Sequence, residues 1–166
     1  MNKLQQILKL VEDSDVFRNW HKKHTNSYLC AFFRNIENTD NIEWQVHYYW
    51  PENDTITVFS VGAEIKIIEE DSLILKNDND RVEELKLDNV NVDLFRALEI
   101  ADNYRKENYP KEETVKRLVI LQKLKRIVWN ITCMTLSVNL LNVKVDAESG
   151  EVIEESMGPL LKYGRG

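Results

Sequence analysis

The sequence of 166 residues contains only two cysteines, a scarcity that excludes a fold held together by several disulfides. Cys30 and Cys133 each lie in an apolar run, where a reduced cysteine behaves as a small hydrophobe. The chain has only three histidines, and their spacing matches no recognised zinc motif. His21 and His24 could bind a metal with His47 or Cys30 as a third ligand, but surface histidines are the favoured interpretation. We therefore predict neither a metal site nor a cofactor.

Long apolar runs and a surplus of basic residues are also missing. No run of about 18 apolar residues occurs, so no transmembrane helix is predicted. The apolar stretch within residues 1–15 is too short and too interrupted for a signal peptide, which predicts a cytoplasmic protein. Acidic residues outnumber basic ones by 28 to 22, and the formal net charge of −6 opposes general binding to nucleic acid.

Acidic residues are plentiful, but their arrangement does not predict catalysis. Glu69, Glu70 and Asp71 are adjacent in the sequence, as are Glu154 and Glu155. Neighbouring residues of a strand point to opposite faces, so such pairs make poor general acid and base partners. Because neither a glycine-rich phosphate loop nor a Gly-x-Ser-x-Gly motif occurs, we predict that the protein is not an enzyme.

The first half of the chain combines helical spacing of apolar residues with strand alternation. The spacing predicts an amphipathic helix over 2–12 and a short helix capped by Ser14, and it leaves open whether these are one bent helix. The alternation that follows predicts four strands: 27–33, 42–50, 55–61 and 65–68. The polar residues 76–80 then predict a connecting loop.

The second half repeats the order of helix and strands. A stripe of apolar residues predicts a helix over 92–107, which Pro110 ends. Four further strands are predicted: 115–123, 127–135, 141–146 and 151–155. Gly150 can adopt the positive φ that closes the last hairpin.

This last hairpin carries a short motif that resembles the closing hairpin of PepSY-type domains. The motif consists of a valine, Asp-Ala, a spacer and Gly-Glu-Val, at Val145, Asp146, Ala147, Gly150, Glu151 and Val152. The resemblance is clearest over 92–155. It implies a cystatin-like unit, in which one helix packs on a curved antiparallel sheet. It also implies a family associated with protein binding and the restraint of peptidases, without catalytic residues of its own.

A shift of the chain by 85 residues overlays Trp44–Ile68 on Trp129–Ile153 without a gap, mostly at predicted core positions. Ile56 then matches Leu141, and Val58 matches Val143. A duplicated unit explains this match, with chance similarity of amphipathic strands as the alternative.

We therefore predict an α+β fold of two similar helix-plus-antiparallel-sheet units of cystatin-like or PepSY-like type, the first at about 2–75, and leave open whether the two share one sheet. The predicted domains are a first repeat, a connecting segment, a PepSY-like second repeat and a flexible tail, at 1–76, 77–90, 91–158 and 159–166.

The function predicted from these features is that of a non-enzymatic module of PepSY-like type that binds or regulates a protein or peptide. The polar strand faces and the aromatic cluster next to a turn supply its candidate binding residues: His47, Tyr49, Trp50, Asn130 and Thr132. One alternative is a cystatin-like cone that binds a small ligand or acts as an enzyme. Another is a structural subunit that forms a homodimer through a sheet edge.

Overall fold

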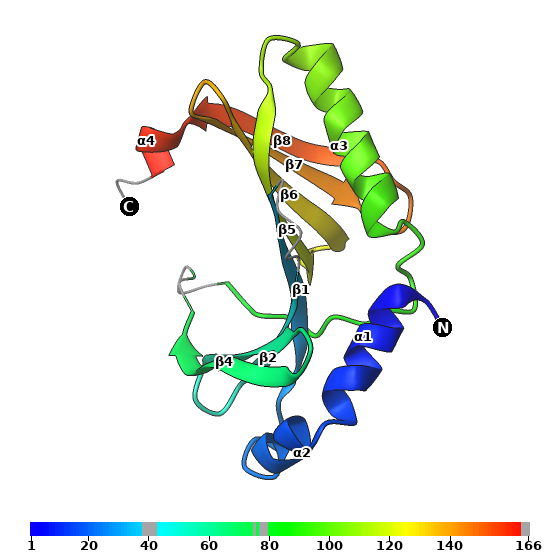
Figure 1. Cartoon of the computed structure of the whole chain (residues 1–166), viewed down its shortest axis with the longest axis vertical. Coiled ribbons are helices and arrows are strands. Elements are labelled where there is room, and N and C mark those ends of the chain that lie inside the picture. The colour runs from blue at the N-terminus through cyan, green and yellow to red at the C-terminus, as the bar shows by residue number, and fades with distance from the viewer. Residues whose placement is uncertain (38–42, 75, 77–79, 164–166) are drawn as a thin grey trace. The chain divides into compact units, whose positions relative to one another are not determined.

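The computed structural model describes the whole chain except residues 38–42, 75, 77–79 and 164–166. It divides into two compact units, one formed by residues 1–33 with 43–88 and the other by residues 34–42 with 89–166. Each unit combines helices with antiparallel strands, which confirms the predicted α+β class (Figure 1).

Two separate helices open the first unit, α1 (Lys3–Glu12) and α2 (Asp15–His21). Asn2 caps α1 in a reciprocal capping box with Gln5, and the Ser14 hydroxyl accepts from the Phe17 N–H at the start of α2. Each cap satisfies backbone donors that have no partner within the helix, so the chain starts a new helix at Ser14.

The first unit's strands follow in the order β4-β3-β2-β1 across the sheet. Their bounds are β1 (Tyr28–Ile36), β2 (Trp44–Trp50), β3 (Thr55–Val61) and β4 (Ile65–Leu73). The last three residues of β1 are grouped with the second unit. An aromatic cluster forms the core between the helices and the sheet, where Phe17 and Trp20 pack on Tyr48 and Phe59 at centroid distances of 5.0–5.6 Å.

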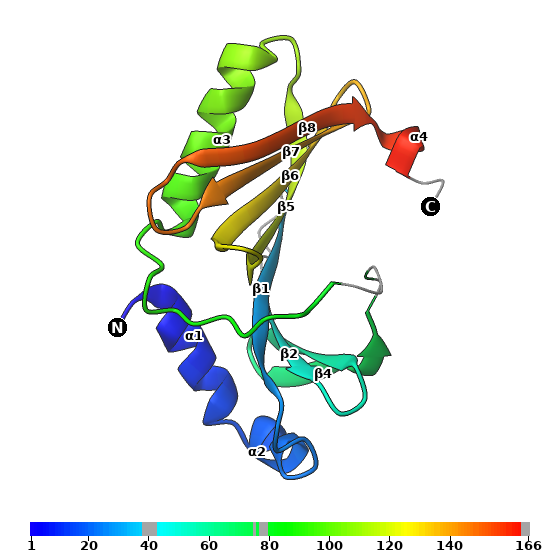
Figure 2. The same cartoon turned by 180° about the vertical axis from the view of Figure 1, so that it is seen from behind.

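In the second unit, one helix covers a face of four strands in the order β5-β6-β7-β8 (Figure 2). The elements are α3 (Leu94–Asn108), β5 (Thr114–Lys123), β6 (Ile127–Thr135), β7 (Asn139–Asp146), β8 (Val152–Pro159) and α4 (Leu160–Tyr163). The short α4 lies at the start of the predicted C-terminal tail, and the flexibility of that tail stays a prediction. Trp129 on β6 is fully buried, and its indole N–H donates to the Val92 carbonyl at 2.8 Å.

The β7–β8 hairpin is held at its turn by Asp146. Its Oδ1 accepts hydrogen bonds from the backbone N–H groups of Glu148 and Ser149, each at 2.9 Å, and Arg126 pairs with Oδ2. Burial opposes ionisation of this carboxyl, but these donors outweigh it and lower the pKa of Asp146. The φ of Gly150 is +79°, as predicted from its position in the turn.

We expect Gly150→Ala to destabilise the protein by about 1–2 kcal/mol, because a positive φ is sterically unfavourable for a residue with a Cβ atom. The added Cβ would lie 3.4 Å from Ile100 Cδ1, an ordinary contact, so the cost comes from the backbone. Urea denaturation measures it, with Glu148→Ala at an exposed position of the same turn as the control. If the two variants unfolded at the same urea concentration, the positive φ of Gly150 would not be the cause of the destabilisation.

The 85-residue match between the halves fails in the third strand of each unit. Trp44 and Trp129 both lie in the second strand of their units, but the turn at 51–54 is one residue longer than that at 136–138. One extra residue reverses the faces of the strand that follows. The ungapped shift therefore places Phe59, which is fully buried, on Lys144, whose ammonium pairs with Glu154. The matches of Ile56 and Val58 are wrong by one residue, while duplication itself stays a prediction.

Candidate functional site

One of the predicted binding residues, Tyr49, is buried and does not contribute to an open surface. Tyr49 is only 8% exposed, and its hydroxyl donates to Asp54 Oδ1 at 2.6 Å. The Lys76 ammonium lies over the Tyr49 ring, 5.6 Å from its centroid. The prediction of an exposed Tyr49 is wrong because Tyr28 and Lys76 pack on its ring, contacts that strand periodicity does not reveal.

His47 lies on the same strand face as Tyr49. Its Nε2 is 3.3 Å from Gln45 Oε1, and its ring centroid is 6.2 Å from that of Phe33. Burial lowers the pKa of His47 to about 4, so the ring is uncharged at neutral pH. His47 is half-buried on this face, and its role in binding stays a prediction.

Trp50 lies apart from these two residues, while Asn130 and Thr132 meet in the second unit. The Trp50 ring is 4.5 Å from that of His24, on the helix-covered side. The Asn142 side-chain amide donates to Asn130 Oδ1 at 2.6 Å and to Thr132 Oγ1 at 2.9 Å. The structure therefore brings together only Asn130 and Thr132 of the predicted set, through a third residue that the sequence did not single out.

Both cysteines are buried thiols. Burial raises the pKa of Cys30 to about 12, and its Sγ donates to the His47 carbonyl at 3.3 Å. Burial also raises the pKa of Cys133. A thiol held in its protonated form is a poor nucleophile.

A groove of about 500 Å³ opens in the first unit, lined by α1, α2, the start of β1, β2 and residues 84–88. Residues 84–88 are pinned to β1 where the Leu85 N–H donates to the Leu29 carbonyl at 2.8 Å. Leu85 and Leu87 are buried, whereas Glu84, Lys86 and Asp88 are exposed. This segment was predicted to be a connector, although its alternation of apolar and polar residues could have indicated a strand-like segment packed on the unit.

The wall of this groove carries a tyrosine paired with a carboxylate. The Tyr48 hydroxyl donates to Glu12 Oε1 at 2.8 Å, and Tyr48 is 4% exposed. Burial, then the charge of Glu12, raise the pKa of Tyr48, so the phenol stays a neutral donor. The lining contains three carboxylates, those of Glu12, Glu84 and Asp88. The carboxylate of Glu84 lies 3.8 Å from the Lys86 ammonium. With Phe17 and Leu29 also in the lining, the groove is partly apolar and carries an excess of negative charge.

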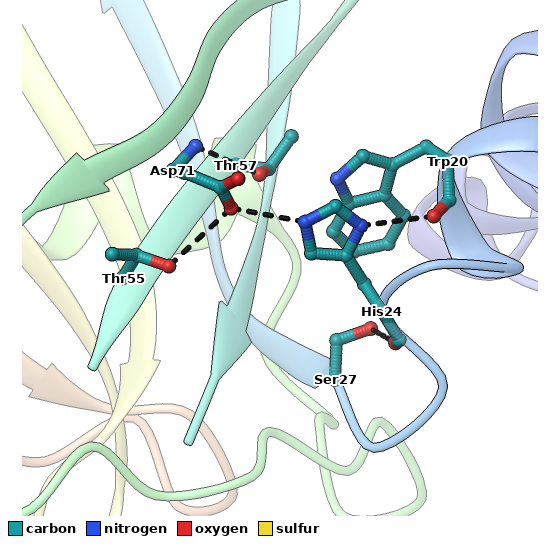
Figure 3. A network of polar contacts seen from close by, with 6 residues as sticks. All are labelled: Trp20, His24, Ser27, Thr55, Thr57 and Asp71. Carbon is teal, nitrogen blue, oxygen red and sulfur yellow. Dashed lines mark hydrogen bonds and ion pairs between the residues drawn. The ribbon is translucent and has the colours of Figure 1, made fainter. Parts of the chain in front are cut away.

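A polar network centred on His24 lies between the turn after α2 and the end of β4 (Figure 3). His24 is 3% exposed, so its prediction as a surface histidine is wrong. Its Nδ1 is 2.9 Å from the Trp20 carbonyl oxygen, and its Nε2 is 3.0 Å from Asp71 Oδ1. The Thr55 hydroxyl donates to Asp71 Oδ1 at 3.4 Å, and the Asp71 N–H donates to Thr57 Oγ1 at 3.3 Å.

A β-bulge brings Glu70 to the same cluster. The β3–β4 pairs on either side of Thr57 leave Glu70 and Asp71 together opposite this one residue, and Asp71 has a φ of +51°. One oxygen from each carboxylate and a ring nitrogen of His24 lie within 4.8 Å of one another. The prediction that these adjacent carboxylates point to opposite faces is therefore wrong, because it assumed a regular strand.

Comparisons with known proteins establish the fold alone. No family model and no curated protein matches the sequence. The structure is similar to the crystal structure of "a putative lipoprotein" from Clostridium difficile 630, with a TM-score of 0.53 and 17% identity. The match covers 87% of this chain and 91% of that chain. Within the described residues, none of the helices has the length and apolar character needed to span a bilayer.

Proposed function

We propose that the protein is a non-enzymatic binding module of PepSY-like type, and that the groove of its first unit holds a segment of a peptide or protein. The observation that carries this proposal is the Glu12–Tyr48 pair set in a partly apolar groove. Tyr48 orients the carboxylate by donating one hydrogen bond at 2.8 Å, and the remaining lone pairs of Glu12 are left to a ligand.

The chemistry of the groove favours a basic side chain as the bound group. A lysine or arginine would lay its alkyl stem against Phe17 and Leu29 and bring its charge to Glu12. The carboxylates of Glu84 and Asp88 add to the negative potential at the groove, which attracts cations and repels acidic segments.

The volume of the groove supports a second candidate, a small amine-bearing ligand. A cavity of about 500 Å³ lies within the usual range for small-molecule sites. Pairing of sheet edges is less favoured, because the terminal strands β4 and β8 carry the acidic residues Glu69, Glu70, Glu154 and Glu155. Like charges on an edge oppose its pairing with a second copy.

Fluorescence anisotropy with short labelled peptides tests the peptide proposal. The peptides share apolar flanks and differ only in a central arginine, lysine, glutamine or glutamate. We expect the basic peptides to bind best and Glu12→Gln to weaken them about tenfold or more, since a hydrogen bond to a charged group contributes about 1.5–3 kcal/mol.

Glu107→Gln, at an exposed position on α3, removes the same charge elsewhere and serves as the control. Equal binding of all four peptides, or unchanged binding by Glu12→Gln, would contradict the proposal. Competition by N-acetyl-arginine amide as effective as that by the arginine peptide would favour the small-ligand candidate instead.

A further inference from the structure

We propose that His24, Glu70 and Asp71 form a binding site for a divalent transition metal, with Zn²⁺ as the best fit. This site is independent of the groove. The sequence could not reveal it, because the bulge in β4 creates the cluster and the histidine lies 46 and 47 positions away from the two carboxylates. Three steps lead to the proposal: the tautomer of His24, the orientation of its ring and the donor set.

Hydrogen-bond partners determine which ring nitrogen of His24 can bind a metal. Nδ1 lies 2.9 Å from the Trp20 carbonyl oxygen, which can only accept, so Nδ1 carries a proton. Nε2 then faces Asp71 Oδ1 at 3.0 Å. A nitrogen lone pair and a carboxylate oxygen repel at this distance unless a cation joins them. The cation is either a proton on Nε2 or a metal ion.

The surroundings of His24 fix the ring in the orientation that a metal ligand needs. Metal-bound histidines commonly donate their second ring N–H to a backbone carbonyl, as Nδ1 does here. The ring stacks on Trp20 with centroids 4.5 Å apart and an interplanar angle of 13°, and Trp50 meets it edge-on at 4.5 Å. Figure 3 shows the imidazole held between the Trp20 carbonyl and Asp71. Because the His24 side chain is already held in place, its loss of conformational entropy on metal binding would be small.

The donor set fits zinc better than calcium or magnesium. One imidazole and two carboxylates supply three ligands, and Zn²⁺ accepts nitrogen and oxygen donors at about 2.0–2.2 Å, which places tetrahedral ligand atoms about 3.3 Å apart. The observed separation of 3.0 Å between Nε2 and Oδ1 needs only a small adjustment. Glu70 and Asp71 are exposed, so the site is open to solvent and a water molecule can complete the tetrahedron.

A zinc ion would take the place of a proton between Nε2 and Asp71 Oδ1, so direct measurement of zinc binding distinguishes the two possible cations. Isothermal titration calorimetry of the full chain, stripped with EDTA, measures this binding. We expect one zinc per chain. Asp71→Asn and Glu70→Gln should each weaken zinc binding about tenfold or more.

Glu69→Gln, at the adjacent exposed position of β4, is the matched control and should bind zinc like the wild type. His24→Gln tests the nitrogen ligand, but this buried substitution can disturb the fold, so the two exposed carboxylate variants decide the outcome. Circular dichroism confirms that each variant is folded. Absence of zinc binding by the wild type would overturn the proposal, as would equal binding by Glu69→Gln and Asp71→Asn.

Discussion

Replacing Trp129 by alanine is expected to lower the free energy of unfolding by about 3–5 kcal/mol. The side chain is fully buried beneath α3, and its removal would leave a large cavity in the core of the second unit. The substitution also removes the donor that satisfies the Val92 carbonyl, which precedes α3, at 2.8 Å. Denaturation in guanidinium chloride, followed by circular dichroism, measures the change.

Two further variants separate the causes of this loss. Phe95→Ala removes an aromatic ring from the exposed side of α3, where the side chain is 78% accessible, and should change stability by no more than about 0.5 kcal/mol. Trp129→Phe keeps most of the packing but leaves the Val92 carbonyl without its donor, so an intermediate loss is expected. If Trp129→Ala and Phe95→Ala unfolded at the same midpoint, the burial of Trp129 beneath α3 would be refuted.

Local patterns predicted most of the fold because helix stripes and strand alternation are local properties. The apolar positions Leu4, Ile7 and Val11 are buried as the stripe predicted. The hairpin motif was also informative, since Gly150 and Asp146 act within a few residues of each other. Such features need no knowledge of what packs on them.

The errors arise where one extra residue moves the side chains that follow it to the opposite face of the sheet. The longer turn before β3 moves Phe59 to the helix-covered face, and the bulge in β4 turns Glu70 and Asp71 toward one histidine. The ungapped shift assumed turns of equal length and so misaligned Ile56 and Val58, and alternation assumed a regular strand and so placed the two carboxylates on opposite faces. Turn length and bulges depend on how a strand pairs with its neighbour. The alternation of residues within one strand carries no information about that pairing.

The candidate sites were harder to predict because distant segments build them. The groove needs residues 84–88 to return to β1, and the Tyr49 ring is contacted by Lys76, which lies beyond the end of β4. His24 is buried because Trp20 and Trp50 enclose it from two elements. Asn130 and Thr132 share one face of a regular strand, where Asn142 bonds to both, and their role in binding stays a prediction.

Lowering the pH from 6.5 to 4 is expected to remove about 3 kcal/mol of stability through His47 alone. Burial lowers the pKa of this histidine to about 4 in the folded protein, against 6.5 for an ordinary histidine. At a pH between these two pKa values, His47 is protonated in the unfolded chain and uncharged in the folded protein. The stabilisation is therefore complete above pH 6.5 and is lost as the pH falls toward 4.

A comparison of wild type with His47→Gln isolates this contribution, because glutamine keeps a polar side chain but has no proton to gain. Asp146, whose pKa is lowered, also contributes stability that acid removes, but it does so mostly below pH 4 and equally in both proteins. Urea denaturation at a series of pH values should show a steep loss of stability between pH 6.5 and 4 for wild type and a shallower one for His47→Gln. Parallel curves over this interval would mean that His47 takes up its proton as readily in the folded protein as in the unfolded chain, and the ring would then be open to solvent and available to a ligand.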